Sequence, residues 1–401
     1  MYFCSPNDRV QQVITLVSDN IISSIGFTTD DNYRNVKQGT SGLCFYSGNF
    51  DLPEAFVASM IDVEKLDDEF SRLQNQKPET GNQKPVNYTK LEKAAILSIS
   101  EALKNTEINP CDEKVLFVLS TTKGNIFLLE SFHRGYYELE QIYLWRSAEL
   151  IAGYFNNPNT PITISNACIS GAQALIAAKR ALQTRKHKYL IVTGIDMLSP
   201  FIVSGFQSFK ALSPGKCKPF DASRDGLNIG EAAATIILTD KKEKYLRTGA
   251  VVLSAGAIRN DANHISGPSR TGEGAYLALR NVCEGINTNE LAFINAHGTA
   301  TPYNDEMESI AITRASLQHI PVTCQKGYFG HTLGAAGVVE SIISTRALKD
   351  RIVLKTHGFK TSGVSHQLQI VKKTQPISGN HCINMLSGFG GCNAALLWHL
   401  K

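Results

Sequence analysis

Cys168 stands where a short apolar run ends and a helical pattern begins. The run 162–164 predicts a buried strand, and apolar residues at three- and four-residue steps over 174–182 predict a helix. A thiol at such a corner faces free backbone N–H groups and the positive end of the helix dipole, which favours the reactive thiolate. The same N–H groups can hold an oxyanion after the sulfur attacks a carbonyl. Cys168 is therefore a candidate nucleophile, and the alternative at this point is a buried, inert thiol.

Two histidines in the second half of the chain have matching surroundings. His297 follows the apolar run 291–295, and His331 precedes a Gly- and Ala-rich helix start. Both therefore stand at the ends of regular elements, where side chains project into a cleft. A cysteine at a helix start with two such histidines suits acyl-thioester chemistry. The thiol would accept the acyl group, and if the attacking carbon comes from a malonyl thioester that loses CO2, two imidazole donors would stabilise the enolate oxygen. The alternative for each histidine taken singly is a capping or solvated residue.

An ammonium group close to the histidines would orient and polarise one of them. Lys326, five residues before His331, is the candidate. Carboxylates from Asp305, Glu308 and Glu340 could hold that lysine in turn. The alternative for these carboxylates is a solvated helix face.

A glycine-rich loop near the C-terminus, LSGFGGCN, allows close approach of the backbone to a ligand, with Phe389 as a bulky, movable side chain. The loop does not follow the GxGxxG pattern, so it does not indicate a dinucleotide site.

Composition excludes several classes of protein. The net charge of +4 over 401 residues, with no basic run interleaved with aromatics, argues against nucleic-acid binding. Nine cysteines without CxxC spacing argue against a disulfide scaffold or a structural zinc site, so no metal is expected. The N-terminus lacks a signal-peptide pattern, and no apolar run reaches the roughly 18 residues of a membrane span. We expect a cytoplasmic protein without a membrane segment.

Strand and helix patterns alternate along the chain, which predicts an α/β architecture with covered sheets. The charged run DKKEK suggests two halves, 1–239 and 240–401, alike in rhythm although no sequence repeat is evident. Residues 88–103 predict a helix with a Thr-Glu capping box at its start. The polar stretch 62–82 predicts a surface loop, and the aromatic-rich segment 125–154 is predicted to be helical.

Six motifs in order resemble those of the elongating β-ketoacyl-acyl-carrier-protein synthases, condensing enzymes of the thiolase fold. The resemblance extends from about Tyr88 to the C-terminus. It rests on NACISG around Cys168, KPFDASRDGLNIGEAA, DANHISGPSRTGEG, NAHGTATPYND, KGYFGHTLGAAGVVE and SGFGGCN.

The resemblance implies a five-layer αβαβα fold of two pseudo-symmetric halves, and an acyltransferase that forms carbon–carbon bonds in fatty-acid or polyene/polyketide-type biosynthesis. It implies no tightly bound cofactor, since substrates arrive on the phosphopantetheine arm of an acyl carrier protein. It also implies a dimer, either of two copies of this chain or with a homologous subunit.

The resemblance also assigns roles by position. Cys168 would be the nucleophile, and His297 and His331 the decarboxylating pair. The other assigned roles are Lys326 with Asp305, Glu308 and Glu340 in its network, the N–H groups of Cys168 and Phe389 as the oxyanion hole, Phe389 as the gate of the acyl pocket, Thr299 and Thr301 as phosphopantetheine contacts, and Lys210 as a carrier-protein contact.

The chain departs from the family pattern in places that leave the catalytic motifs intact. GEAA replaces the usual GEGA, GCN at Cys392 replaces GTN, and residues 55–86 do not match. Three alternatives are weighed on the motifs. A non-catalytic, chain-length-factor-like partner would lack the nucleophilic cysteine, a degradative thiolase would use a second cysteine such as Cys392 as its base, and a starter-type synthase would carry Asn in place of His331.

Overall fold

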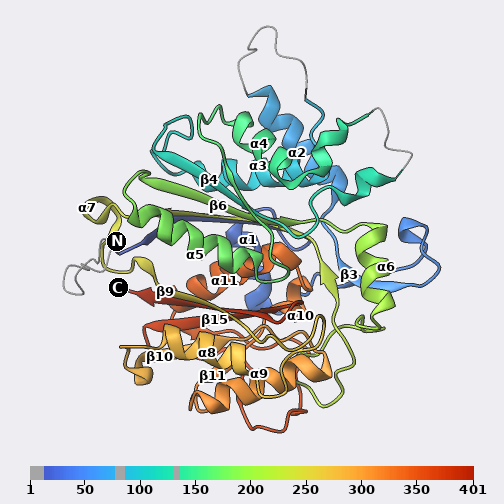
Figure 1. The fold of residues 1–401 in the computed structure, drawn as a ribbon, viewed down its shortest axis with the longest axis vertical. Coiled ribbons are helices and arrows are strands. Elements are labelled where there is room, and N and C mark those ends of the chain that lie inside the picture. Colours follow the sequence, from blue (N-terminus) through green and yellow to red (C-terminus); the bar gives the residue numbers. More distant parts are fainter. Residues whose placement is uncertain (1–12, 77–85, 131–135) are drawn as a thin grey trace.

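Strands from both parts of the chain form one eleven-stranded mixed sheet in the computed structural model, which describes residues 13–76, 86–130 and 136–401 (Figure 1). In spatial order the strands are β13 (Gln369–Ile370), β11 (Pro321–Thr323), β10 (Leu291–Asn295), β15 (His381–Gly388), β16 (Cys392–Leu400), β9 (Val251–Asn260), β1 (Thr15–Ser23), β8 (Ala232–Thr239), β6 (Tyr189–Asp196), β4 (Val115–Ser120) and β5 (Ile162–Ile164). The N-terminal and C-terminal parts join where Thr15 of β1 pairs with Val252 of β9.

The two parts of the sheet repeat one topology. In the N-terminal part the strands follow one another in space as β5, β4, β6, β8 and β1. In the C-terminal part they follow one another as β11, β10, β15, β16 and β9. When the strands of each part are numbered along the chain, both orders read third, second, fourth, fifth, first. In each part the first three strands in this spatial order are parallel to one another. The next strand in space, β8 or β16, is antiparallel to both strands beside it. The sequence suggests only that strands and helices alternate in a similar way in the two halves, and the structure shows that the two parts of the sheet share one strand order. The boundary between residues 239 and 240 stays a prediction.

Helices complete five layers, as the resemblance implies (Figure 1). One outer layer covers the N-terminal part of the sheet, a middle layer lies between the two parts, and a second outer layer covers the C-terminal part. The outer helices on the N-terminal side are α2 (Val63–Asn75), α3 (Lys90–Leu103) and α4 (Leu144–Tyr154), the middle ones are α5 (Ser170–Gln183) and α11 (Ala336–Lys349), and the opposite outer ones are α8 (Glu273–Val282) and α9 (Pro302–Arg314).

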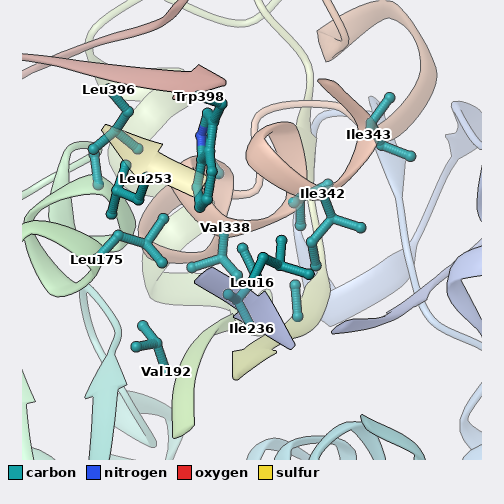
Figure 2. Packing of buried hydrophobic residues seen from close by; sticks show 14 of the residues in the cluster. Leu16, Leu175, Val192, Ile236, Leu253, Val338, Ile342, Ile343, Leu396 and Trp398 are labelled. Atoms are coloured by element: carbon teal, nitrogen blue, oxygen red, sulfur yellow. The ribbon is translucent and has the colours of Figure 1, made fainter. Parts of the chain in front are cut away.

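The middle layer holds the largest apolar core. Leu175 of α5 and Val338 of α11 lie between strands of the two parts of the sheet, and Trp398 of β16 is fully buried beside them (Figure 2). Burial on every side explains why these elements read as nearly continuous apolar runs. The middle layer matters for function because the start of α5 and the start of α11 both border the site described below.

Shorter elements connect these layers. The helices among them are α1 (Thr29–Gln38), α6 (Pro200–Ser208), α7 (Lys242–Tyr245) and α10 (Lys326–Phe329). The small strands are β2 (Cys44–Tyr46), β3 (Phe56–Ser59), β7 (Ile229–Gly230), β12 (Ile352–Val353) and β14 (Gln375–Pro376). The 3-10 turns are η2 (Asn49–Asp51), η3 (Ile126–Leu129), η5 (Leu139–Ile142), η6 (Thr288–Glu290) and η7 (Leu333–Ala335). Within the described ranges, no helix has the length and apolar character that crossing a bilayer requires.

Helix α3 begins as its sequence predicts. The Thr89 hydroxyl accepts a hydrogen bond from the backbone N–H of Glu92, and the Glu92 carboxylate accepts one from the N–H of Thr89. This reciprocal capping box satisfies two N–H groups that have no partner inside the helix.

Two predictions of local structure are wrong in part. The stretch 62–82, expected to be a loop, contains helix α2, which buries Leu66 and Phe70 four residues apart and is capped by Asp62. Two buried apolar residues in thirteen are enough once α3 supplies a surface for them, although residues 77–82 lie outside the described part. The segment 125–154 is α-helical only from Leu144 onward; η3 and η5 precede it, and residues 131–135 are not described.

Candidate active site

Cys168 lies at a sharp corner between β5 and α5. Ala167 adopts a left-handed φ of 45°, and the chain enters α5 at Ser170, two residues after the cysteine. A left-handed conformation is strained for alanine, and such strain is typical of functional corners. Cys168 is only 9% exposed, yet it lines a cavity of about 510 Å³.

The cavity brings together most of the residues that the motifs single out. His297 and His331 line it with Cys168, as do residues at its mouth: Thr299, Thr301, Phe389 and Lys210. The imidazole rings of His297 and His331 meet edge to face, with centroids 5.0 Å apart and planes at 86°. His297 comes from the C-terminal end of β10 and His331 from the turn before η7. Residues far apart in sequence therefore face one space beside the cysteine.

Lys326 lies behind His297. Its Nζ is 3.1 Å from Nδ1 of His297 and donates to Oε1 of Glu340 at 2.6 Å. Burial opposes the charge on Lys326, but Glu340 raises its pKa, so the group is an ammonium. An ammonium has no acceptor, hence Nδ1 of His297 accepts and its proton sits on Nε2.

His331 reaches the same tautomer by another contact. Its Nδ1 accepts from the backbone N–H of Leu333 at 3.4 Å, which leaves the ring proton on Nε2. That Nε2 is buried and has no hydrogen-bond partner among the described residues. Burial, and then the charge of Lys326, holds the pKa of both His297 and His331 well below the usual range. The site thus holds two neutral imidazoles, each with an N–H donor at Nε2.

The three carboxylates expected around Lys326 divide into two groups. Glu340 contacts the lysine, and Asn295 donates to its other oxygen at 3.0 Å. Glu308 instead accepts from the backbone N–H groups of His297 and Gly298, each at 2.7 Å. Asp305 accepts from the N–H of Phe220 at 2.7 Å and of Ala300 at 3.2 Å. No hydrogen bond joins either of them to the lysine among the described residues, because both point from α9 into the loop that carries His297.

The expectation of a readily formed thiolate is wrong for the resting site. Burial, followed by the neighbouring Cys392, raises the pKa of Cys168 to about 12. A backbone hydrogen bond from Phe389 acts in the opposite direction but is the weakest of these effects. The start of α5 is nearby, as predicted, but the loss of water around the sulfur outweighs it. The Phe389 N–H nevertheless faces the sulfur, and an oxyanion hole of the Cys168 and Phe389 N–H groups stays a prediction.

This pKa predicts the pH profile of alkylation at Cys168. Only the thiolate attacks iodoacetamide, and a group with a raised pKa is protonated throughout the neutral range. We expect the rate to rise about tenfold per pH unit from pH 7 to pH 10, without a plateau. Peptide mass spectrometry of the Cys168 adduct measures the rate. A plateau below pH 9 would contradict the raised pKa.

The remaining predicted contacts surround the mouth of the cavity. The hydroxyl groups of Thr299 and Thr301 lie 2.8 Å apart, so together they present a donor and an acceptor. Lys210 is exposed and follows α6. Phe389 is 39% exposed on the loop between β15 and β16. These positions agree with the expected phosphopantetheine, carrier-protein and gate contacts, whose roles stay predictions.

The sequence reasoning missed Asp196, a buried carboxylate at the end of β6. It accepts from the Thr121 hydroxyl at 2.7 Å, from the N–H of Thr122 at 2.9 Å and from the N–H of Gly334 at 2.6 Å. Burial raises its pKa, and these hydrogen bonds oppose that shift. Asp196 thus ties the turn after β4 to the segment that follows His331. In the sequence, the feature that could have revealed Asp196 is that it is the single carboxylate at the end of an otherwise largely apolar strand, YLIVTGID.

Gly230 is a second missed residue, and it predicts a stability effect. Its N–H donates to the carbonyl of His331 at 3.0 Å, and a Cβ at this position would overlap the carbonyl oxygen of Phe329. Gly230→Ala is expected to lower the free energy of unfolding by about 1–3 kcal/mol, because backbone rather than a flexible side chain must move. Denaturant unfolding measures this. Gly215→Ala is the control, since a Cβ there meets nothing within 4 Å; equal stability of the two variants would contradict the prediction.

Family models match both parts of the chain. The model of the beta-ketoacyl synthase N-terminal domain matches residues 28–244, and that of the C-terminal domain matches residues 250–360. The chain belongs to the β-ketoacyl synthase family. This confirms the resemblance and the thiolase-like fold that it implies.

Individual relatives agree with the family. A protein of Schizosaccharomyces pombe, provisionally named as a mitochondrial 3-oxoacyl-[acyl-carrier-protein] synthase, is 28% identical over 94% of this chain and 96% of its own length. The 3-oxoacyl-[acyl-carrier-protein] synthase 2 of Rhizobium meliloti is 32% identical, over 59% of each chain. Among solved structures, the ketosynthase in complex with its chain length factor from Xenorhabdus doucetiae is 23% identical, covers 100% of both chains and has a TM-score of 0.83, which is a likeness of fold.

Proposed function

We propose that this β-ketoacyl synthase joins an acyl group held on Cys168 to a malonyl unit carried by an acyl carrier protein, with loss of CO2. The observation that carries the proposal is the convergence of Cys168, His297 and His331 on one cavity, with two neutral Nε2 donors. Neutral donors suit the reaction because the enolate oxygen that forms on decarboxylation needs hydrogen bonds in a site without water. The name of the Rhizobium meliloti relative supports an acyl carrier protein as the substrate's carrier.

The first half-reaction is acyl transfer. The sulfur of Cys168 attacks the carbonyl carbon of the incoming thioester and a new S–C bond forms. The bond between that carbon and the carrier's sulfur breaks, and the carrier leaves as a thiol with the proton that Cys168 gave up. The N–H groups of Cys168 and Phe389 stabilise the oxyanion during the attack. Since the resting thiol is protonated, its proton must move to the departing sulfur as the S–C bond forms, because both imidazoles already carry a proton on Nε2 and their Nδ1 atoms are occupied.

The second half-reaction forms the carbon–carbon bond. The malonyl thioester loses CO2, and its enolate oxygen accepts hydrogen bonds from Nε2 of His297 and of His331. The enolate carbon attacks the acyl thioester, the C–S bond breaks, and Cys168 regains a proton. Lys326 keeps Nδ1 of His297 occupied, so that its Nε2 stays a donor throughout.

A dimer is part of the proposal. Within the described chain, edge strand β5 pairs with β4 alone. Beside it, Tyr143 and Trp145 are 55% and 50% exposed and stack with centroids 6.0 Å apart. A free strand edge next to exposed aromatic rings favours pairing with another chain. Solved relatives include ketosynthases with a chain length factor, which makes a homologous subunit a candidate partner beside a second copy.

The test is mass spectrometry of the intact protein after incubation with a panel of acyl carrier thioesters, followed by addition of malonyl carrier protein. We expect an acyl adduct, then release of one CO2 for each β-ketoacyl product. The donor accepted would distinguish fatty-acid from polyene or polyketide-type substrates. Absence of both adduct and CO2 with every donor would overturn the proposal in favour of a non-catalytic partner subunit. A cytoplasmic location stays a prediction, since some relatives are named mitochondrial.

A further inference from the structure

The ring of Phe389 rests on two aromatic rings of helix α6. Phe206 lies nearly parallel to it with centroids 6.1 Å apart, and Phe209 meets it edge to face at 5.5 Å. All three rings line the mouth of the active-site cavity. Phe209 is 59% exposed, and together with Phe206 and Phe389 it forms an apolar cluster at that mouth.

The backbone on either side of Phe389 is fixed, whereas its ring is not. The N–H of Gly390 donates to the carbonyl of Ile265 at 2.7 Å, and Asn260 donates to the carbonyl of Gly390 at 2.8 Å. On the other side, a Cβ at Gly388 would come within 2.8 Å of Cys392 Sγ, so the loop is tightly packed there. The exposed ring and its contacts with α6 are therefore the part of this loop that can change most easily.

Helix α6 is a firm support for those contacts. Ser199 caps its first turn with Pro200 at the start, and the N–H of Ala211 returns to the carbonyl of Phe206 at 3.1 Å. Phe209 ends the helix, and Lys210 turns the chain with a left-handed φ of 51°. The position of the Phe209 ring is thus set by α6 and not by the loop that carries Phe389.

We propose that Phe209 is a positioning residue that latches Phe389 over Cys168, so that α6 sets how readily the acyl pocket opens. The inference rests on the proposed acyl transfer to Cys168 and adds to it the element that controls access. An edge-to-face aromatic pair shifts an open–closed equilibrium by about threefold to tenfold. Loss of the Phe209 ring should therefore increase the access of reagents and acyl donors to Cys168 by that factor.

The experiment compares Phe209→Ala with wild type in two measurements. The first is the rate of Cys168 alkylation by iodoacetamide at one fixed pH, and the second is the rate of acyl loading from an acyl carrier thioester. Phe201→Ala is the matched control, because Phe201 is 56% exposed on the same helix and does not line the cavity. Phe209→Leu keeps an apolar group and removes the ring, which covers the case in which the alanine variant is unstable.

A double-mutant cycle tests whether Phe209 acts through Phe389. We expect alkylation and loading to be about threefold to tenfold faster in Phe209→Ala and Phe209→Leu, unchanged in Phe201→Ala, and not increased further when Phe209→Ala is added to Phe389→Ala. Wild-type alkylation rates in both Phe209 variants, or full additivity with Phe389→Ala, would overturn the latch. If wild type takes up no acyl group, the proposed function fails, but the alkylation rates still decide on the latch.

Discussion

Replacing Cys168 with alanine is expected to abolish the acyl adduct and to lower condensation by at least about a thousandfold, because no other cysteine among the described residues lines the cavity. The sulfur is the atom that faces the Phe389 N–H, and Cys168 lines the same cavity as both histidines. Release of CO2 from malonyl carrier protein should persist, since His297 and His331 remain. Mass spectrometry of the intact variant and a CO2 assay measure the two steps separately.

Two other cysteines supply the controls for that result. Cys283, at the end of α8, is half-buried and does not line the cavity, so Cys283→Ala should load acyl groups as wild type does. Cys392 lies behind the site, and its sulfur is 3.3 Å from the carbonyl oxygen of Phe389. Condensation should survive Cys392→Ala. An acyl adduct on Cys168→Ala would contradict the nucleophile, and loss of activity in Cys392→Ala would favour the thiolase interpretation.

His331→Ala is expected to slow CO2 release by about 100- to 1000-fold, the usual cost of removing one donor from an oxyanion site. Its Nε2 is buried and unpartnered among the described residues, which is costly in the resting protein and useful once an enolate oxygen arrives. Acyl loading of Cys168 should continue, since the N–H groups that stabilise that step are unchanged. The assay is CO2 release from malonyl carrier protein, with the acyl adduct measured in parallel.

His357→Ala is the matched control for this variant, because His357 is half-buried, has a lowered pKa through burial as its main cause, and does not line the cavity. It should release CO2 at the wild-type rate. Unchanged CO2 release in His331→Ala would exclude the assigned role. Together with Cys168→Ala, the expected pattern is reciprocal: one variant loses the adduct and keeps decarboxylation, and the other does the opposite.

Local patterns were sufficient for much of the architecture. The apolar runs 162–164 and 291–295 coincide with β5 and β10, and the capping box at Thr89 starts α3. These features depend on neighbours within a few residues, which is why one sequence can reveal them. The prediction of a loop at α2 was wrong for the converse reason, because its two buried side chains favour a helix only when the surface of α3 is there to cover them.

The sequence by itself determined the family, the order of the motifs and the identities of the catalytic candidates Cys168, His297 and His331, but not most of the other residues that line the cavity. The tertiary structure decided how they act. It placed Glu340, and neither Asp305 nor Glu308, against Lys326, and it gave both histidines their Nε2 protons. It also raised the pKa of Cys168 to about 12, against the local expectation from the start of a helix. The physical reason is that desolvation and charge proximity depend on every chain segment packed around a group, and no local pattern contains them.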